Sequence, residues 1–336
     1  MFCPYPFSRC EIKADGNVYC CCEGWLPKPL GSVLNDNLIT IWRGPAAIEI
    51  RESIVDNSFR HCTACPFLPG PGGPLTVEPT KTLSFERIGT LKLDYDQSCN
   101  LACPSCRIVH SDKFVNRNEI RKIHEIVLAS GALNCTDQLY ITGAGDPFAS
   151  ELYWHFLCNL PDLSYNPTLT VFLHTNGLLL DTEHWKELGP NSDRVTHIGI
   201  SIDAATPETY ALNRGASWDR LMNNLTFITD LRTRNRRSLM LGLFFVVQAN
   251  NFQEMSKFVQ FGLSYDVNWI AFSALRNRRT YSNTEYLNRA VHLTSHPQYT
   301  QFQKTLKNPY LKNPIVVMET FNPSYTNQYI ACNPNS

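Results

Sequence analysis

The sequence predicts an α/β fold in which a parallel sheet closes into a complete or partial barrel. Short apolar runs rich in β-branched and aromatic residues recur from residue 91 onward, and stretches with helical periodicity separate them. The strand candidates are Leu91 to Tyr95, Gln138 to Thr142, Leu169 to His174, His197 to Asp203, Leu239 to Val247 and Trp269 to Ala274. Strands that alternate with helices form right-handed βαβ units, which are the repeating element of such barrels.

The segments between these strands carry apolar stripes at helical spacing. The stripes are Ile120, Ile123, Ile126 and Val127, then Leu221, Leu225 and Ile228, and then Phe252, Met255 and Val259. We interpret them as core contacts of helices, without a functional role. The run from Leu239 to Val247 is almost continuously apolar, as expected for a parallel strand that is covered on both faces.

The domain organisation follows from a segment rich in proline and glycine. Such residues break regular structure, so we expect an inter-domain linker at residues 68–82. The preceding residues, 1–67, form a unit that needs metals or disulfides to fold, and they hold seven of the 13 cysteines. We expect the barrel at residues 83–280 and a C-terminal extension of helical and extended segments at residues 281–336.

Composition limits the classes of partner and the compartment. The 336 residues include 30 basic and 30 acidic side chains, so the charge excess of a nucleic-acid binder is missing. No apolar run reaches the length of a membrane span, and the N-terminus lacks the regions of a signal peptide. We therefore expect a cytoplasmic protein without nucleic-acid or membrane partners. In that reducing compartment the cysteines are expected to be metal ligands.

The most informative motif is Cys99-Asn-Leu-Ala-Cys103-Pro-Ser-Cys106, which directly follows the first predicted strand of the barrel. Three thiolates can hold a [4Fe–4S] cluster and leave one iron free to bind a substrate or cofactor. The alternatives are a structural zinc site or a set of core cysteines. Zinc usually takes four protein ligands, and His110 is the one further candidate close to this loop.

This loop resembles the cluster loop of the radical S-adenosylmethionine (AdoMet, SAM) enzymes. In that family the free iron binds AdoMet, and an electron from the cluster cleaves AdoMet to a 5′-deoxyadenosyl radical. The resemblance implies a partial (β/α)6 TIM-like barrel with the cluster loop after its first strand. It also implies that Cys99, Cys103 and Cys106 ligate the cluster.

Segments after later strands also resemble the AdoMet-binding segments of this family. Thr142-Gly-Ala-Gly-Asp-Pro147 is similar to its Gly-Gly-Glu-Pro segment, although Ala144 and Asp146 depart from the commonest residues. The resemblance implies that AdoMet contacts Gly143, Ala144, Gly145, Asp146, Asn176, Ser201, Asp203, Arg214 and Gln248. Other interpretations remain open: an ordinary βα turn at the first segment, capping by Asp203 and Thr206, and loop stabilisation by Gln248.

The N-terminal cysteines resemble the auxiliary-cluster module called SPASM, or twitch in its shortened form. Cys3 is followed by twelve residues, Gly16, four residues and Cys21, and Cys62-Thr-Ala-Cys65 comes later. Asp15 and Gly16 predict a hairpin turn. The resemblance implies one auxiliary [4Fe–4S] cluster held by Cys3, Cys21, Cys62 and Cys65, although the module normally follows the barrel. The roles of Cys10, Cys20 and Cys22 are left open, and a zinc ribbon is the alternative.

Taken together, the resemblance implies a radical SAM oxidoreductase or maturase with a small cysteine-rich iron–sulfur domain before its barrel. Hydrogen abstraction from the substrate would be followed by oxidation, such as dehydrogenation or cross-linking, with the auxiliary cluster as electron carrier. We expect a peptide substrate and an external reductant such as flavodoxin or ferredoxin. The alternatives are a carbohydrate-like or other small metabolite and, in another class, a non-catalytic zinc or iron–sulfur binding protein. The sequence identifies no catalytic acid or base.

Overall fold

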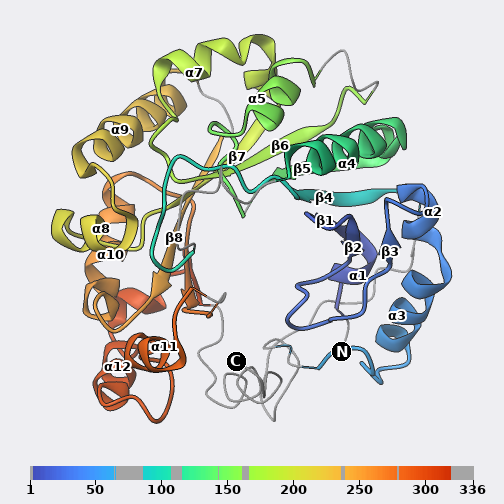
Figure 1. Ribbon diagram of the computed structural model, residues 1–336. Helices are drawn as coiled ribbons and strands as arrows, with labels where there is room; N and C mark the ends of the chain where they lie inside the picture. Colours follow the sequence, from blue (N-terminus) through green and yellow to red (C-terminus); the bar gives the residue numbers. More distant parts are fainter. Residues whose placement is uncertain are drawn as a thin grey trace. The chain divides into compact units, whose positions relative to one another are not determined.

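The computed structural model in Figure 1 describes residues 3–63, 65, 86–106, 116–142, 144–160, 166–235, 239–277 and 280–318. The chain divides into two compact units. The first comprises residues 1–98, 114–173 and 188–195, and the second comprises residues 99–113, 174–187 and 196–336. None of the described helices combines the length and the apolar character needed to cross a membrane.

The first unit is built on a mixed sheet in the order β6-β5-β4-β1-β2-β3. Its strands are β1 (Arg9–Lys13), β2 (Asn17–Tyr19), β3 (Gly31–Ser32), β4 (Ile88–Asp94), β5 (Thr136–Ile141) and β6 (Thr170–Thr175), whose last two residues belong to the second unit. Strands β1, β4, β5 and β6 are parallel, and β1, β2 and β3 pair antiparallel. The helices are α1 (Tyr5–Ser8), α2 (Leu38–Arg43), α3 (Pro45–Val55), α4 (Arg117–Ala129) and α5 (Glu151–Cys158).

The second unit contains a parallel sheet in the order β7-β8-β9-β10. Its strands are β7 (Val195–Ser201), whose first residue belongs to the first unit, β8 (Met240–Val247), β9 (Trp269–Ala274) and β10 (Val316–Met318). The helices are α7 (Thr182–Glu187), α8 (Pro207–Arg214), α9 (Trp218–Asn235), α10 (Met255–Ser264), α11 (Asn283–Arg289) and α12 (Tyr299–Thr305).

All six strands predicted from the sequence are present as β4 to β9, with ends that differ by a few residues. The predicted hairpin turn is also confirmed, because β1 and β2 pair antiparallel around Gly16, which has a φ of 78°. Two pairings were not predicted: β1 lies parallel to β4, and β10 lies parallel to β9. The N-terminal hairpin therefore shares a sheet with the first strand of the predicted barrel.

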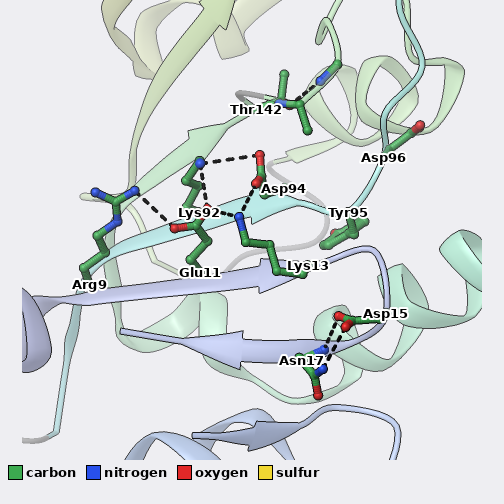
Figure 2. A network of polar contacts seen from close by, with 12 residues as sticks. Arg9, Glu11, Lys13, Asp15, Asn17, Lys92, Asp94, Tyr95, Asp96 and Thr142 are labelled. Atoms are coloured by element: carbon green, nitrogen blue, oxygen red, sulfur yellow. Dashed lines mark hydrogen bonds and ion pairs between the residues drawn. The ribbon is translucent and has the colours of Figure 1, made fainter. Parts of the chain in front are cut away.

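The two faces of the first unit's sheet differ sharply in polarity. Leu91, Leu93 and Tyr95 are buried on one face, where the hydroxyl of Tyr95 lies 2.8 Å from Nδ1 of His124 in α4. Successive side chains of a strand point to opposite faces. The other face of β4 consequently carries the charged residues Lys92 and Asp94, which meet the charged side chains of β1 (Figure 2).

The segment that leaves β4 is fixed by side chains of α5 and of its N-terminal cap. The hydroxyl oxygen of Tyr153 accepts hydrogen bonds from the backbone N–H groups of Tyr95 and Asp96, at 3.2 and 3.0 Å. The carboxylate of Asp96 in turn accepts hydrogen bonds from the hydroxyl of Ser150 and from the backbone and hydroxyl of Ser98. The chain is thereby held in one conformation up to the residue before Cys99.

We predict that Tyr153→Phe lowers the free energy of unfolding by about 2 to 4 kcal/mol, because it leaves two buried backbone N–H groups without an acceptor. Anaerobic urea unfolding followed by circular dichroism measures the change. The control is Tyr310→Phe, since Tyr310 is 45% exposed and its loss of a hydroxyl should alter stability by less than about 0.5 kcal/mol. Equal stability of the two variants would contradict the role given to Tyr153.

Candidate functional site

The three-cysteine loop lies in the second unit, and its cysteines differ in exposure. Cys103 is buried, whereas Cys99 and Cys106 are partly exposed. The N–H of Cys106 donates to the carbonyl of Cys103 at 2.9 Å, which closes a turn. The amide nitrogen of Asn176 lies 3.8 Å from the Cys99 sulfur and 2.8 Å from the side-chain oxygen of Asn100. His110, the alternative fourth ligand, lies outside the described residues.

Arg214 brings a positive charge to this loop from the end of α8. Its backbone carbonyl lies 3.8 Å from the Cys103 sulfur, and its Nη1 lies 3.1 Å from Oδ2 of Asp203. Burial lowers the pKa of Arg214, but the negative charges of Cys103 and Asp203 outweigh this effect and raise it above its ordinary value. The guanidinium therefore stays charged and favours thiolates in its neighbourhood.

The helix that carries Arg214 has strong local start and stop signals. Thr206 caps α8 by accepting a hydrogen bond from the N–H of Thr209, Pro207 occupies the first turn, and Gly215 ends the helix with a φ of 65°. These are the preferred residues at the three positions. The capping interpretation of Thr206 is confirmed.

Asp203 is engaged within the protein on both carboxylate oxygens. Oδ1 accepts a hydrogen bond from the backbone N–H of Val246 at 2.7 Å, and Oδ2 accepts one from Nη1 of Arg214. Its backbone has a φ of 61°, and its carbonyl accepts the side-chain amides of Asn213 and Asn251. Burial raises the pKa of Asp203 more than Arg214 lowers it. The arrangement suits a residue that orients Arg214.

Asn176, Ser201 and Gln248 lie at the carboxyl ends of β6, β7 and β8. The hydroxyl of Ser201 lies 2.8 Å from Nε2 of His174, whose ring stacks on Phe244 with 4.3 Å between centroids. Gln248 is buried, and its N–H donates to the side chain of Asn251 at 2.7 Å. The backbone of Gln248 thus stabilises the loop after β8. Its side-chain amide takes no part in that hydrogen bond.

Three buried polar atoms near these strand ends have no hydrogen-bond partner within the described part of the chain. They are Oε1 of Gln248, Nε of Arg214 and the hydroxyl of Tyr210. A buried donor or acceptor without a partner costs free energy, so such atoms are expected where a ligand completes the hydrogen bonding. A polar ligand such as AdoMet fits this requirement.

Tyr210 and Tyr281 were not singled out from the sequence. The hydroxyl of Tyr281 is also buried without a hydrogen-bond partner among the described residues, and the Arg289 guanidinium lies 4.8 Å from its ring centroid. Burial raises the pKa of both tyrosines, and the Cys103 charge adds to the shift. Neither residue was predicted to contact the cluster loop, and the effect of the Cys103 charge on both places them in its neighbourhood.

The turn after β5 belongs to the first unit and contains the predicted residues Ala144, Gly145 and Asp146; Gly143 lies outside the described residues. The hydroxyl of Thr142 accepts the N–H groups of Ala144 and Gly145, each at 3.1 Å. A Cβ on Gly145 would lie 2.5 Å from the carbonyl oxygen of Ser98, so glycine is required there. A tight βα turn accounts for these contacts, and a role in AdoMet binding stays a prediction.

The four predicted auxiliary ligands lie near one another in the first unit. Burial, followed by the charges of Cys65 and Cys3, raises the pKa of Cys62 to about 12. Burial also raises the pKa values of Cys3 and Cys21, and each is raised further by the Cys65 charge. Metal ligation requires thiolates, so binding of a cluster here would release the protons of these thiols.

Among the described residues, no three His, Cys, Asp or Glu side chains are arranged to hold a single metal ion. A four-iron cluster places each cysteine sulfur on a different iron, so it needs neighbouring thiols without the tight tetrahedron of one zinc ion. The N-terminal thiols are neighbours of one another, as a four-iron cluster requires.

Two further N-terminal cysteines, Cys10 and Cys20, lie in and after the hairpin, and the charges of Cys62 and Cys3 add to the effect of burial in raising the pKa of Cys20. Glu11 pairs with Tyr19 and Ile12 with Val18. Cys10 lies in β1 on the face of Ile12, Cys20 directly follows the end of β2, and both thiols are buried. Arg51 packs there too, with its guanidinium 4.2 Å from the Trp42 ring and its pKa lowered by burial to about 10.

Comparison with known families agrees with this geometry. Residues 97–259 match the Radical SAM superfamily, and residues 3–66 match the SPASM family, described as an iron-sulfur cluster-binding domain. The chain belongs to the radical SAM superfamily and carries an N-terminal SPASM domain. Its cofactors are consequently a [4Fe–4S] cluster, AdoMet and auxiliary iron–sulfur clusters. No curated protein matches its sequence.

Several solved structures are similar to parts of this chain. Streptococcus suis SuiB bound to its precursor peptide SuiA has 10% identity and a TM-score of 0.46, over 82% of this chain and 62% of SuiB. TYW1 with a lysine-pyruvate adduct has 15% identity and a TM-score of 0.41, over 67% of this chain and 71% of that one. AdoMet-bound anSMEcpe has 20% identity and a TM-score of 0.40, over 56% and 50% of the two chains.

We predict that Asp203→Ala lowers the free energy of unfolding by about 3 to 5 kcal/mol, because it leaves the buried Arg214 charge uncompensated. Asp203→Asn should cost less, since its amide oxygen can still accept the N–H of Val246. Anaerobic urea unfolding measures both. The control is Asp266→Ala, an acid whose side chain is 98% exposed and lies 3.9 Å from Arg232. A similar loss in the control would contradict the prediction.

Proposed function

We propose that Cys99, Cys103 and Cys106 hold the [4Fe–4S] cluster with which the enzyme generates a 5′-deoxyadenosyl radical from AdoMet. The observation that carries the proposal is the convergence of the cysteine loop with Asn176 and Arg214 within the second unit. When bound, the cluster and AdoMet supply the radical that abstracts hydrogen from the substrate. The protein must bind and orient both groups.

Four residues of the second unit have distinct parts in this proposal. Arg214, oriented by Asp203, stabilises the thiolates by its charge and offers its Nε–H to an acceptor on AdoMet. The side-chain amide of Asn176 orients the loop at Cys99 and Asn100. The Oε1 of Gln248 accepts a hydrogen bond from the bound ligand. The contact of Ser201 with AdoMet remains a proposal at the end of β7.

In the first unit, we propose that Cys3, Cys21, Cys62 and Cys65 ligate one auxiliary [4Fe–4S] cluster that carries electrons. Loss of an electron from a substrate radical gives net oxidation, such as dehydrogenation or cross-linking, which makes the enzyme an oxidoreductase or maturase. Because some enzymes with a SPASM domain modify ribosomally made peptides, we favour a peptide substrate over a carbohydrate-like metabolite. Flavodoxin or ferredoxin would supply electrons in the reducing cytoplasm, where the cysteines stay available as ligands.

We expect the combined Cys99→Ala, Cys103→Ala and Cys106→Ala variant to form no 5′-deoxyadenosine from AdoMet under dithionite, because no protein ligand then holds the open cluster. Anaerobic reconstitution followed by chromatography of the nucleosides measures the product. Cys158→Ala, at the end of α5, is the matched control and should retain full AdoMet cleavage. Undiminished cleavage by the triple variant would refute the assignment of the loop.

Replacing Cys3, Cys21, Cys62 and Cys65 by Ala should lower the iron content from about eight to about four per chain while AdoMet cleavage remains measurable. Iron, sulfide and zinc analysis after anaerobic reconstitution checks this. The control is Cys158→Ala, which removes a thiol at the end of α5, outside both cysteine motifs, and should keep about eight irons. One zinc and no sulfide at the N-terminal site would establish a zinc ribbon instead.

A further inference from the structure

One face of the first unit's sheet carries a row of charged and aromatic side chains that runs across four parallel strands. The register pairs Glu11 of β1 with Lys92 of β4. It also pairs Lys92 with Tyr140 of β5, and Tyr140 with Phe172 of β6. Register partners in a parallel sheet point to the same face, so these four side chains are neighbours. The contacts agree, because Nζ of Lys92 lies 5.6 Å from the Tyr140 ring centroid and the rings of Tyr140 and Phe172 lie 4.4 Å apart.

Figure 2 shows the charged part of this face. Glu11 forms ion pairs with Nη2 of Arg9 at 3.2 Å, Nζ of Lys13 at 2.6 Å and Nζ of Lys92 at 2.7 Å. Asp94 forms ion pairs with the same two lysines, at 2.7 and 3.4 Å. Three cations share two carboxylates, so the cluster has one excess positive charge.

The excess positive charge lies between the two lysines. Arg9 offsets the charge of Glu11, which leaves both ammonium groups to share Asp94. The two Nζ atoms contact the same oxygen, Oε1 of Glu11, so they lie close to each other. An ammonium group has three N–H donors, and each lysine meets only two carboxylates among the described residues. The side chains of Lys13 and Lys92 are 25% and 13% exposed, so an anion from solvent can reach the remaining donors.

We propose that this face binds the substrate and that the substrate presents a carboxylate next to an aromatic group. The inference rests on the proposed function. Lys13 and Lys92 hold the carboxylate between their ammonium groups through charge-assisted hydrogen bonds. Tyr140, which lies beside Lys92, packs with Phe172 against the aromatic group. An acidic peptide segment and a small aromatic carboxylate share this chemistry, and the test separates them.

The charge balance and the place in the fold both favour a binding role over a purely structural one. Ion pairs that served only to align two strands would need no excess cation, and a partly buried charge without a counter-charge costs free energy that a bound anion offsets. Lys13 and Asp94 are the last residues of β1 and β4. In α/β barrels the carboxyl ends of the parallel strands carry the active site. Glu11 and Asp94 act as positioning residues for the two lysines.

The test compares three probes on the full-length protein with reconstituted clusters: acetyl-Glu-Phe-amide, acetyl-Gln-Phe-amide and 3-phenylpropionate. Ligand-observed NMR titrations under anaerobic conditions give the dissociation constants. The Glu peptide should bind about tenfold more tightly than the Gln peptide, because the two differ only in the carboxylate. Tighter binding of the Glu peptide than of 3-phenylpropionate supports a peptide source, and the reverse order supports a small metabolite. Equal affinity for the two peptides together with no binding of 3-phenylpropionate would overturn the inference.

Two variants assign the binding to this face. Lys13→Gln should abolish the preference for the carboxylate probes, and Tyr140→Leu should weaken all three probes while it keeps the preference. The matched control is Arg87→Gln, since Arg87 is an exposed cation of the same unit that pairs with Asp137, and it should leave every affinity unchanged within about twofold. An unchanged preference in Lys13→Gln would overturn the inference, and if that variant does not fold, unchanged binding by Tyr140→Leu would do so.

The binding measurements require no turnover, so the two proposals can fail separately. An enzyme that cleaves AdoMet but does not distinguish the probes would refute the substrate site and leave the proposed function standing. A protein that binds the carboxylate probes but forms no 5′-deoxyadenosine would refute the proposed function, and with it the assignment of this face to a substrate.

Discussion

The ion pairs between β1 and β4 are the constraint on which the N-terminal half of the structure depends. Glu11 is the register partner of Lys92, and Lys13 is the partner of Asp94, so the charges specify one alignment of the two strands. A slip by one residue would turn these side chains into the apolar face that contains Leu91. Buried ion pairs add little net stability, but breaking one leaves a costly unpaired charge, which makes this register specific.

In the second unit, a comparable constraint acts at the end of β7. Asp203 adopts a positive φ, which is unfavourable for a residue with a Cβ, and the loop offsets it with hydrogen bonds from Asn213, Asn251 and Val246. Because that conformation aims the carboxylate at Arg214, the strain and the site geometry have one cause. The position of the Arg214 charge beside Cys103 thus depends on hydrogen bonds to Asp203, and none of the three cysteines of the loop takes part in them.

The sequence allowed the strands of the barrel and the cysteine motifs to be predicted because both are local signals. Continuous apolar runs mark β8 and β9, and the ligand spacing of the loop at Cys99 spans eight residues. The pairing of β1 with β4 could not be predicted, since Lys13 and Asp94 are 81 positions apart and β1 alternates charged and apolar residues like any hairpin strand. Tyr281 was missed for the same reason, because the fold alone brings it toward Cys103.

The pairing of β1 with β4 also explains how a SPASM domain can precede the barrel in the chain. Parallel strands need a long crossover connection, and the one between β1 and β4 contains α2 and α3. The side chain of Asn37, which caps α2, donates to the carbonyl of Ser130 at the end of α4, so the start of α2 lies beside the end of α4. The N-terminal module therefore continues the βα architecture of the barrel by one unit. Of the proposed auxiliary ligands, Cys3 precedes the hairpin, and Cys21 and Cys62 belong to the crossover, so a cluster held by them would require no separate domain after the barrel.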